Sequence, residues 1–556
     1  MITPAGWMNA GNADFLREQL SSELTLEELF LFGSYKLFAA DQGPAPTPTV
    51  ESAILVATKA PAPKGHKLRV VALEDEAAVA GRAELLAEMA RRASAKGGRR
   101  GGIHAHSIAQ VDLRPEYPWP VKFGRRDVAA QVVARLTGAL ADPAEPIEPL
   151  VGAWKIFQGI QTGADAYTKR IEKRLIAVDR SELDRKGVAI GEAVLEISRA
   201  ATRESPWREH PHVLVKSPES RGLLYGAIDD DYTYLIVARK EPHRDVLDHL
   251  ERFRPILSTR AEIARNPRRK WWEAAWPRDE GDLRSPKVIA LYRTDRGRFA
   301  LDEDGEWQPS IKSTVVVGRE EKAPVAYLCG LLNSELLDLW YAVRGKTPRD
   351  VWRNYEPKRM NEMPYRRPEG DPRAEEIAEL VREIAANRRA LLPHRSVVRD
   401  LGRIVKDPWK SGPVAIDRPA LVAELGKGDS VSVRLDPGLE IEGKPAGKSR
   451  REKPDVLAFR RGGAETGRVV GDPERLELLV EIVGARSIDD PGSVLLPKDL
   501  DSFDQLAQER ARTVSELLAD GRRKVEQVER LVCTLYGLPD ELTEAVVQHA
   551  VERAAR

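Results

Sequence analysis

The sequence predicts a mixed α+β protein built from several domains. Two nearly continuous apolar runs, at residues 26–32 and 52–58, are typical of buried strands. Short strand-like runs alternate with turn residues between 151 and 367, and apolar residues recur at helical spacing over 373–392 and 501–535. A chain of 556 residues is long enough to bury several cores. We therefore expect strands and helices to be divided among three or four domains.

Residues 1–62 predict the last third of a Rossmann-like α/β domain. Asn12 is a good N-cap for a helix over 13–20, whose apolar face carries Phe15, Leu16 and Leu20. The two strands that follow lack the alternation of apolar and polar residues that marks a half-exposed sheet. We expect them in a sheet covered on both faces, with the earlier strands of that domain missing from this chain.

The next two segments predict a connector and a larger module. Residues 63–150 indicate a helical, proline-rich connector with helices at 77–95 and 125–141. Residues 151–368 indicate a mixed α/β module that contains a helix over 246–265, broken near Pro255. Its clearest strands are 213–216, 234–238, 287–292 and 313–317. A helix over 327–344 carries Asn333 and Ser334 within its apolar face, and a basic loop follows it.

The rest of the chain divides into three parts. We expect a helical segment over 369–400 and a β-rich accessory region over 401–500, with strands between 431 and 483. Residues 501–556 predict a helical C-terminal region. The fold class is therefore mixed, with an incomplete α/β tail, a helical connector, a mixed module, a small β region and C-terminal helices.

Charge and cysteine content limit the function. The formal net charge is +1, so any nucleic acid has to be bound by local basic patches. Cys329 and Cys533 both lie in helical apolar patterns, which argues against a disulfide framework and a cysteine-based zinc site. No apolar run reaches the ~18 residues of a membrane span. We expect a cytoplasmic protein with no membrane contact.

Two short patterns match catalytic motifs only in part. Gly345-Lys346-Thr347 matches the end of a phosphate-binding loop, but Trp340 stands where the first glycine of that loop belongs. Asp455 and Glu481 match the acidic half of a metal-dependent nuclease, but Val483 stands where that half requires lysine. We therefore predict neither a nucleotide-binding loop nor a nuclease, and no metal site.

One segment, between residues 268 and 287, interleaves basic and aromatic side chains. They are Arg268, Arg269, Lys270, Trp271, Trp272, Trp276 and Arg278. Such side chains can contact phosphates and stack on bases. Alternatively the tryptophans fill the core and the cations lie at its rim. We favour the core for Trp271 and Trp276, and keep the arginines as candidates for phosphate contact.

Five segments in order resemble the TaqI-like specificity domain of adenine-specific DNA methyltransferases. Residues 158–167, QGIQTGADAY, resemble its G-x-x-T-G-x-N-x-A-F opening. The segments that follow and resemble its later motifs are 249–260, 270–278 with 285–289, 331–336 (LLNSEL) and 361–365 (NEMPY). Residues 528–538 resemble the close of these proteins. The resemblance implies a target-recognition module over 151–368.

The N-terminus resembles the same family, in its type IIG and related members. Residues 37–38 with 50–56 resemble the motif in which an aromatic side chain stacks on a flipped adenine, and Phe38 is the matching position. The chain departs from the family in two places. It has no Asn/Asp-Pro-Pro-Tyr/Phe tetrapeptide and no glycine-bearing cofactor loop. Without them neither the acceptor nor the methyl donor is positioned for transfer.

The resemblance implies DNA target recognition within a restriction-modification or related defence enzyme. The complete enzyme would use S-adenosylmethionine, supplied with its missing motifs by an upstream methyltransferase polypeptide, and this chain alone would bind no cofactor. The alternative is a stand-alone DNA-binding protein or an inactive remnant without enzymatic activity. We expect double-stranded DNA to be contacted by nine cations, namely Lys155, Lys169, Arg268, Arg269, Lys346, Arg349, Arg353, Lys358 and Arg359.

Overall fold

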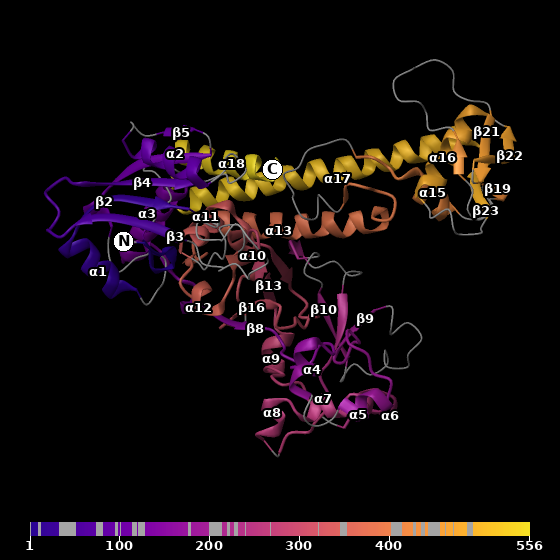
Figure 1. Ribbon diagram of the computed structural model, residues 1–556, viewed down its shortest axis with the longest axis horizontal. Coiled ribbons are helices and arrows are strands. Elements are labelled where there is room, and N and C mark those ends of the chain that lie inside the picture. The colour runs from indigo at the N-terminus through magenta and orange to yellow at the C-terminus, as the bar shows by residue number, and fades with distance from the viewer. Residues whose placement is uncertain are drawn as a thin grey trace. The chain divides into compact units, whose positions relative to one another are not determined.

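The computed structural model separates into two compact units, drawn in Figure 1. Unit 1 holds residues 1–385 and 526–550, and unit 2 holds residues 386–525 and 551–556. The fold is of the mixed α+β class that the sequence predicts. The structure describes residues 2–8, 13–32, 52–73, 82–94, 98–100, 102–113, 119, 128–175, 180–199, 214–218, 223–226, 232–238, 241–266, 268–320, 322–344, 353–401, 414–425, 430–434, 440–442, 456–461, 463–470, 472–485 and 493–555.

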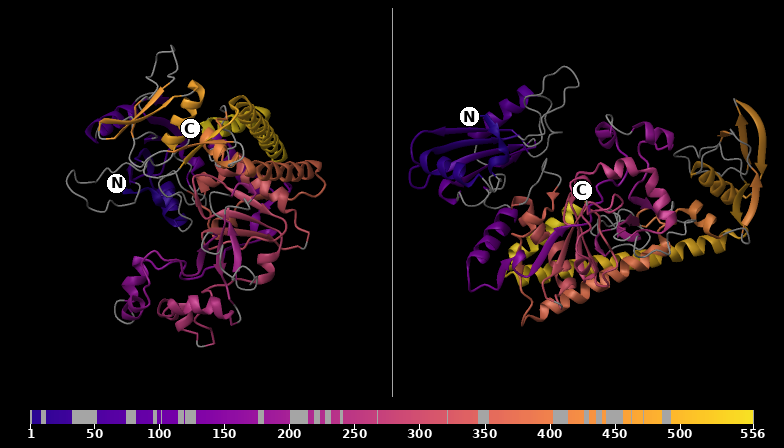
Figure 2. Two further views of the ribbon diagram at one scale, coloured as in Figure 1. Left: turned by 90° about the vertical axis from the view of Figure 1, so that its right-hand side faces the viewer. Right: turned by 90° about the horizontal axis from the view of Figure 1, so that it is seen from below.

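Unit 1 begins with a six-stranded sheet, whose strands lie side by side in Figure 2. They are β1 (Ile2–Pro4), β2 (Thr25–Leu31), β3 (Ser52–Thr58), β4 (Lys67–Leu73), β5 (Gly98–Arg100) and β6 (Ile103–Ala109). Their order is β1-β3-β2-β4-β6-β5, in which β2 and β4 pair in parallel and the other neighbours pair antiparallel. The sheet continues past residue 62, where the sequence analysis placed a domain boundary.

Helices cover both faces of this sheet. On one face η1 (Ala5–Met8) and α1 (Asp14–Glu23) share a core with Leu29 and Leu55. On the other face α2 (Arg82–Ser94) packs Leu85 and Met89 against Val71. The apolar runs of β2 and β3 thus lie in a sheet that is covered on both faces, as the sequence predicts.

A connector leads into the module. It consists of η3 (Gln110–Asp112), α3 (Val128–Ala141), β7 (Ile147–Pro149) and η4 (Leu150–Gly152). β7 pairs antiparallel with β18 (Pro364–Arg366), and the Leu150 amide donates to the Met363 carbonyl oxygen at 2.8 Å. The start and the end of the segment from 151 to 368 therefore lie side by side.

A five-stranded sheet forms the centre of the module. Its strands are β8 (Trp154–Gln158), β11 (Tyr225–Gly226), β13 (Lys287–Leu291), β15 (Phe299–Asp302) and β16 (Ser313–Gly318), in the order β11-β15-β13-β16-β8. β13 is buried along its whole length, and so is β16 up to its last residue. Two central strands of the sheet are thus the apolar runs that the sequence predicts near 287–292 and 313–317.

Short helices and a second sheet form a helical subdomain, here residues 164–264 (Figure 1). Its elements are α4 (Lys169–Leu175), α5 (Arg180–Arg185), β9 (Glu196–Ser198), β10 (Leu214–Pro218), β12 (Tyr232–Ile236), α6 (Arg244–Arg252), α7 (Arg254–Ser258) and α8 (Ala261–Ala264). The strand order is β10-β12-β9, and Leu195, Leu250 and Phe253 lie in the shared core. The predicted break near Pro255 falls at Phe253, where α6 ends before α7.

The helix predicted over 327–344 is two helices, α10 (Val325–Asn333) and α11 (Glu335–Arg344). Ser334 leaves the helical path with an extended backbone, and its hydroxyl accepts from the Leu337 amide at 3.3 Å as a cap of α11. The Asn333 side chain donates to the carbonyl oxygens of Phe299 and Cys329, at 2.9 Å each, and accepts from the Phe299 amide at 3.0 Å. The polar pair therefore ends one helix, ties it to β15 and starts the next.

Unit 1 contains further described elements. They are α9 (Glu280–Arg284), β14 (Arg293–Thr294), β17 (Arg353–Asn354), α12 (Pro357–Met360), part of α13 (Pro372–Leu391), the end of α17 (Leu500–Leu535) and α18 (Asp540–Ala555). Gly330 of α10 faces α13, because a Cβ atom there would lie 2.5 Å from a methyl group of Ile377. The Tyr536 hydroxyl donates to the Pro364 carbonyl oxygen at 2.9 Å. The C-terminal helices are thus packed into the module.

Unit 2 is the β-rich accessory region with its helices. It contains η7 (Leu392–His394), α15 (Arg418–Leu425), β19 (Ser430–Arg434), β20 (Glu440–Glu442), β21 (Val456–Arg461), β22 (Ala464–Val470), α16 (Pro473–Ala485) and β23 (Ser493–Pro497). β19 pairs with β23, and β20, β21 and β22 form an antiparallel sheet. The prediction of strands up to residue 483 is wrong for its last part. There α16 buries Leu476, Leu479 and Val483 at helical spacing.

Two features expected from the sequence concern the cysteines and the apolar helices. Cys329 and Cys533 are buried free thiols, and burial raises the pKa of Cys533 far above its usual value. Among the described helices, none combines the length and the apolar character that crossing a bilayer requires.

Candidate nucleic-acid interface

A rigid turn over residues 158–165 connects β8 to the helical subdomain. Gly159 lies against the neighbouring chain, where a Cβ atom would come within 2.1 Å of the Pro309 carbonyl oxygen, so this position requires glycine. The Thr162 hydroxyl donates to the Asp165 carboxylate and accepts from the Ala164 amide at 3.2 Å. Burial raises the pKa of Asp165, and the hydrogen bond from Thr162 opposes that shift. The turn is therefore fixed by its own side chains.

Arg260 joins this turn to the loop that follows the helical subdomain. Its buried guanidinium donates to the carbonyl oxygens of Leu257 at 3.0 Å, Trp271 at 2.6 Å and Thr162. Burial, followed by the charge of Arg269, lowers the pKa of Arg260 to about 10, so the guanidinium stays protonated at neutral pH. Three carbonyl dipoles replace the water that this charge loses.

The loop over residues 266–278 folds back onto the same turn. Gln161 and Trp276 form an antiparallel bridge, with the Trp276 amide 2.8 Å from the Gln161 carbonyl oxygen and the reverse bond at 3.1 Å. The Ala275 amide donates to the Thr162 carbonyl oxygen at 3.1 Å. We name the assembly of 158–165, Arg260 and 266–278 the Thr162 frame.

Arg269 holds the loop together from inside. Its guanidinium donates to the carbonyl oxygens of Ala274 at 2.7 Å and Ala275, and its Nε lies 3.3 Å from the Glu273 carboxylate. Arg269 therefore has a structural role within the loop, and its contact with DNA stays a prediction. Its three donor nitrogens are all engaged within the loop, so few donors are left for a phosphate.

The frame presents Trp276 to solvent. Half of its side chain, 50%, is exposed, whereas Ala274 and Ala275 beside it are buried. The prediction that Trp276 fills the core is wrong, because the two alanines occupy the inward positions of this segment. Trp271 and Trp272 pack partly buried against the core of the helical subdomain, as the sequence analysis favours for Trp271.

Arg278 closes the frame in a strained conformation. Its φ is +63°, a left-handed value that costs a side-chain-bearing residue about 1–3 kcal/mol. Its Nε donates to the Gly159 carbonyl oxygen at 3.1 Å, and burial lowers the pKa of this guanidinium. The hydrogen bond from Arg278 to Gly159 thus holds the end of the loop against the turn over 158–165, and the surrounding contacts keep Arg278 in its strained conformation.

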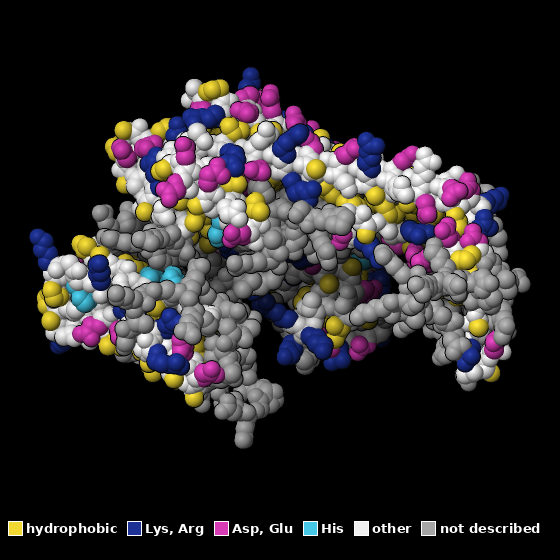
Figure 3. Space-filling model, turned by 90° about the horizontal axis from the view of Figure 1, so that it is seen from above, with side chains coloured by type: hydrophobic (Ala, Val, Ile, Leu, Met, Phe, Trp, Pro, Cys, Tyr) yellow, Lys and Arg dark blue, Asp and Glu magenta, His cyan; other side chains and the backbone are white. Residues whose placement is uncertain are grey.

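Two predicted contact residues, Arg268 and Lys169, are exposed cations of this region, and so is Lys270, which was not among the predicted contacts. Arg268 and Lys270 are exposed on the loop of the frame, and Lys169 is exposed on α4. Ile171, two residues after Lys169, packs against the same core as Trp271. Figure 3 shows one face of the molecule, on which the described Lys and Arg side chains are interspersed with Asp and Glu. Because the two signs of charge are mixed, binding of nucleic acid requires a local cluster of basic residues.

Three further residues were predicted to contact DNA, and two of them lie next to a carboxylate. Lys155 is exposed and pairs with Asp282 of α9. Arg359 is about one-fifth exposed, and its guanidinium lies 3.6 Å from the Glu362 carboxylate. Lys358 is exposed on α12. Lys358 thus has the exposure that a DNA contact needs. The charges of Lys155 and Arg359 are partly neutralised by the carboxylates beside them.

Arg353 is buried, which corrects the prediction that it contacts DNA. Its side chain is 9% exposed, and its guanidinium lies 3.1 Å from the buried Asp338 carboxylate. A guanidinium held in this ion pair is not available to a phosphate. Phe38, Lys346 and Arg349 lie outside the described residues, so the base-stacking position and the basic loop stay predictions.

The segment 285–289 contains a buried ion pair. The Lys287 ammonium lies 2.7 Å from the Asp302 carboxylate, and also donates to the Leu283 carbonyl oxygen at 2.6 Å. Asp302 accepts from the Trp307 amide at 3.1 Å. Desolvation lowers the pKa of Lys287 and raises that of Asp302, and the attraction between the two charges opposes both shifts. This segment stabilises the central sheet and offers no exposed charge.

Sequence reasoning missed the residues that hold the frame. Arg260 and Asp165 lie within segments that resemble the specificity domain, yet neither was given a role. A signal was present for Arg260, because a lone arginine follows the apolar residues Ile256 and Leu257 at the end of a helix. Buried arginines need acceptors, so such a position indicates a hydrogen-bonded structural contact.

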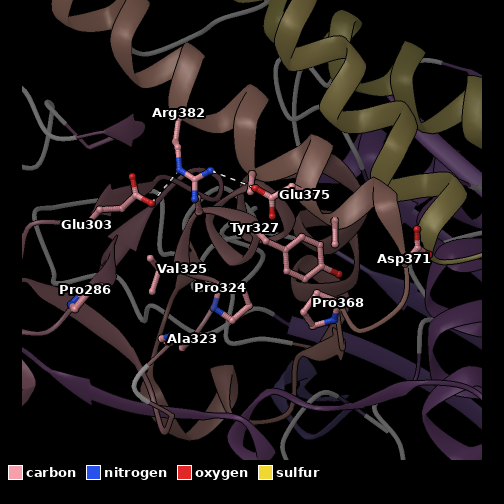
Figure 4. A pocket seen from close by; sticks show the side chains of 14 residues that line it. Pro286, Glu303, Ala323, Pro324, Val325, Tyr327, Pro368, Asp371, Glu375 and Arg382 are labelled. Atoms are coloured by element: carbon pink, nitrogen blue, oxygen red, sulfur yellow. Dashed lines mark hydrogen bonds and ion pairs between the residues drawn. The ribbon is translucent and has the colours of Figure 1, made fainter.

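A cavity of about 490 Å³ lies between the start of α10 and α13 (Figure 4). Arg382 reaches toward it and pairs with Glu303 at 3.1 Å and Glu375 at 3.7 Å. Prolines and small apolar residues form much of the remaining wall. Among the described residues no cluster of three His, Cys, Asp or Glu side chains could hold a metal ion. The wall also carries Lys322 and Asp371, so three carboxylates and two cations line the cavity and no single class of ligand is indicated.

The chain was compared with protein families, with curated proteins and with solved structures. No protein-family model and no curated protein matches the chain. Solved structures that match include the type IIG restriction endonuclease BpuSI, with a TM-score of 0.29 and 14% sequence identity. The match covers 69% of this chain and 42% of that chain, so it spans less than half of the length of BpuSI. At this TM-score the likeness does not bear on function.

Proposed function

We propose that the chain recognises duplex DNA for an adenine-specific DNA methyltransferase of a restriction-modification or related defence system. The Thr162 frame is the observation that carries this proposal. Residues 158–167, 249–260 and 270–278 resemble one specificity domain in sequence, and they meet in the frame through Arg260 and the bridge between Gln161 and Trp276. A frame built from distant segments places an exposed indole and two exposed cations on a rigid loop.

The chemistry of this loop suits a nucleic-acid contact. Arg268 and Lys270 can each neutralise a phosphate, which sets the position of the protein on the duplex. Trp276 can pack against sugar or base edges at the rim of a groove. Because the loop is held by backbone and arginine hydrogen bonds before DNA arrives, little conformational entropy is lost on binding. Base contacts would add about 1–3 kcal/mol of discrimination for each good bidentate pair.

Methyl transfer requires parts that this chain does not contain. The sequence has no Asn/Asp-Pro-Pro-Tyr/Phe loop and no glycine-bearing cofactor loop, so its residues do not fit S-adenosylmethionine. We assign cofactor binding and catalysis to an upstream methyltransferase polypeptide in the cytoplasm, and to this chain the choice of target. Phe38 keeps its proposed place as the residue that stacks on the flipped adenine.

Reconstitution tests this division of labour. The chain is co-expressed with the polypeptide encoded immediately upstream, and N6-methyladenine in the host DNA is measured by mass spectrometry. Methylation that needs both chains, together with an absence of S-adenosylmethionine binding by this chain in calorimetry, supports the proposal. Cofactor binding by the chain alone contradicts it. If the pair does not methylate although the chain binds DNA, the stand-alone DNA-binding alternative is supported instead.

A further inference from the structure

A second basic and aromatic cluster lies on the small sheet of the helical subdomain. Tyr232 and Tyr234 share one face of β12, with ring centroids 5.4 Å apart in an edge-to-face arrangement. The Lys216 ammonium lies 5.2 Å from the centroid of the Tyr232 ring and 5.8 Å from that of Trp307. The Arg199 guanidinium lies 5.3 Å from the Tyr232 centroid. Two cations thus share one aromatic ring.

The backbone holds this cluster in place. Lys216 pairs with Tyr234 in the register of β10 and β12, and its carbonyl oxygen accepts from the Gln308 amide at 2.7 Å. Trp307 is 5% exposed and anchors Tyr232 against the central sheet. The position of Lys216 therefore follows from its place between two sheets, and Arg199 directly follows the last residue of β9.

The positive charge of the cluster is not cancelled at Lys216. In the described part of the chain no carboxylate ion-pairs with its half-buried ammonium. Glu196, on the neighbouring strand β9, is engaged by Lys312 at 2.6 Å and by the Thr233 hydroxyl at 3.1 Å. A cation that rests on a ring face keeps N–H groups for a second partner, and its positive charge favours an anion in that place.

We propose that Lys216 and Arg199, positioned by Tyr232, bind a backbone phosphate of duplex DNA. This site rests on the DNA-binding function proposed above and adds a second contact to the Thr162 frame. A phosphodiester fits because each of its free oxygens can accept from one cation. The ring of Tyr232 already meets both cations, so it serves as a support for them and not as a platform for a base.

The two sites are close enough for one short stretch of duplex. The Ser217 hydroxyl of β10 accepts from the Ser310 amide at 3.1 Å, Ser310 bridges to Ile160, and the next residue, Gln161, bridges to Trp276. At about 4.8 Å for each of these three steps between neighbouring chains, β10 lies at most about 15 Å from the Trp276 backbone. At 3.4 Å per nucleotide along one strand, about four base pairs span that distance.

Charge-neutralising variants test the site. Lys216→Gln and Arg199→Gln are each compared with wild-type by fluorescence anisotropy on a labelled 20-base-pair duplex from 0.05 to 0.3 M KCl. Loss of one phosphate contact should lower the slope of log affinity against log salt by about 0.9, which is about eightfold in affinity at 0.1 M salt. The control is Lys312→Gln, which removes the same charge from an ammonium that Glu196 already pairs, and should leave the slope unchanged.

A further variant separates positioning from charge. Tyr232→Leu keeps both cations but removes the ring beneath them, and should reduce affinity while thermal melting shows a folded chain. If wild-type binds with a steep salt dependence and Lys216→Gln behaves like Lys312→Gln, this site is refuted and the proposed function stands. If wild-type shows no salt-dependent binding, the proposed function fails, and this site fails with it.

Discussion

Replacing Arg260 with lysine should loosen the Thr162 frame while the rest of unit 1 stays folded. The wild-type guanidinium reaches Leu257, Thr162 and Trp271 with three separate nitrogen atoms. Lysine keeps the charge but carries it on one ammonium at the end of a flexible chain, so it cannot reproduce the fork. At least one of the bonds that join the turn to the loop is lost.

The expected cost follows from that lost bond. A hydrogen bond from a charged donor contributes about 1.5–3 kcal/mol. The loop over 266–278 should therefore open about 10- to 150-fold more often, since about 1.4 kcal/mol corresponds to a tenfold change. The amides of Ala275 and Trp276 report on this opening, because they donate to the carbonyl oxygens of Thr162 and Gln161.

Hydrogen exchange of the Ala275 and Trp276 amides is the assay. Faster exchange by the stated factor is expected in Arg260→Lys, with unchanged exchange in β13 and β16. Arg265→Lys is the matched control, since Arg265 is an exposed arginine at the end of α8. Equal protection in Arg260→Lys and in the control would refute the claim that this guanidinium holds the frame.

Further predictions concern buried charges. Lys287→Met should destabilise unit 1 by about 3–5 kcal/mol in chemical denaturation, because Asp302 is left buried and unpaired, and Lys287→Met with Asp302→Leu should recover much of the loss. Arg353→Met should likewise destabilise unit 1, by up to about 3–5 kcal/mol, and lower Tm, because the buried Asp338 loses its ion pair with Arg353, whereas loss of an exposed DNA contact would leave Tm unchanged. Burial raises the pKa of Glu529 well above its usual value, so its contribution to stability is full below about pH 4.3 and is lost as pH rises. Glu529→Gln should therefore raise Tm more at pH 8 than at pH 4, and an equal change at both values would contradict this.

Periodicity predicted the buried strands well and failed where apolar runs are ambiguous. β2, β3, β13 and β16 are short runs bounded by turn residues, and each was identified within a residue or two. Residues 473–485 carry a similar run that forms α16, because its length suits a helix and its apolar positions suit both periods. The break at Ser334 depends on a contact between Asn333 and Phe299, which a local pattern does not contain.

For the candidate site, the sequence indicated which types of residue to expect but not which of them are exposed. Charge and position were enough to single out Arg268, which is exposed on the loop, but the equally exposed Lys270 was not among the predicted contacts. Arg269, between them, and Arg353 look the same in sequence. Their acceptors are carbonyl oxygens and a distant carboxylate, Asp338, which one sequence cannot pair with them. The sequence shows where an arginine stands in the chain. Whether that arginine is exposed depends on tertiary contacts, which the sequence does not show.

The salt dependence of DNA binding tests the central claim most directly. Affinity for a 20-base-pair duplex is measured by anisotropy across KCl concentrations for wild-type, for Arg268→Gln with Lys270→Gln, and for the control Arg180→Gln with Lys186→Gln. The control removes two cations that are ion-paired on the same subdomain. The account predicts a steep slope for wild-type and for the control, and a slope lower by about 1.8 for the loop variant. Equal slopes for the loop variant and the control, or no salt-dependent binding by wild-type, would contradict it.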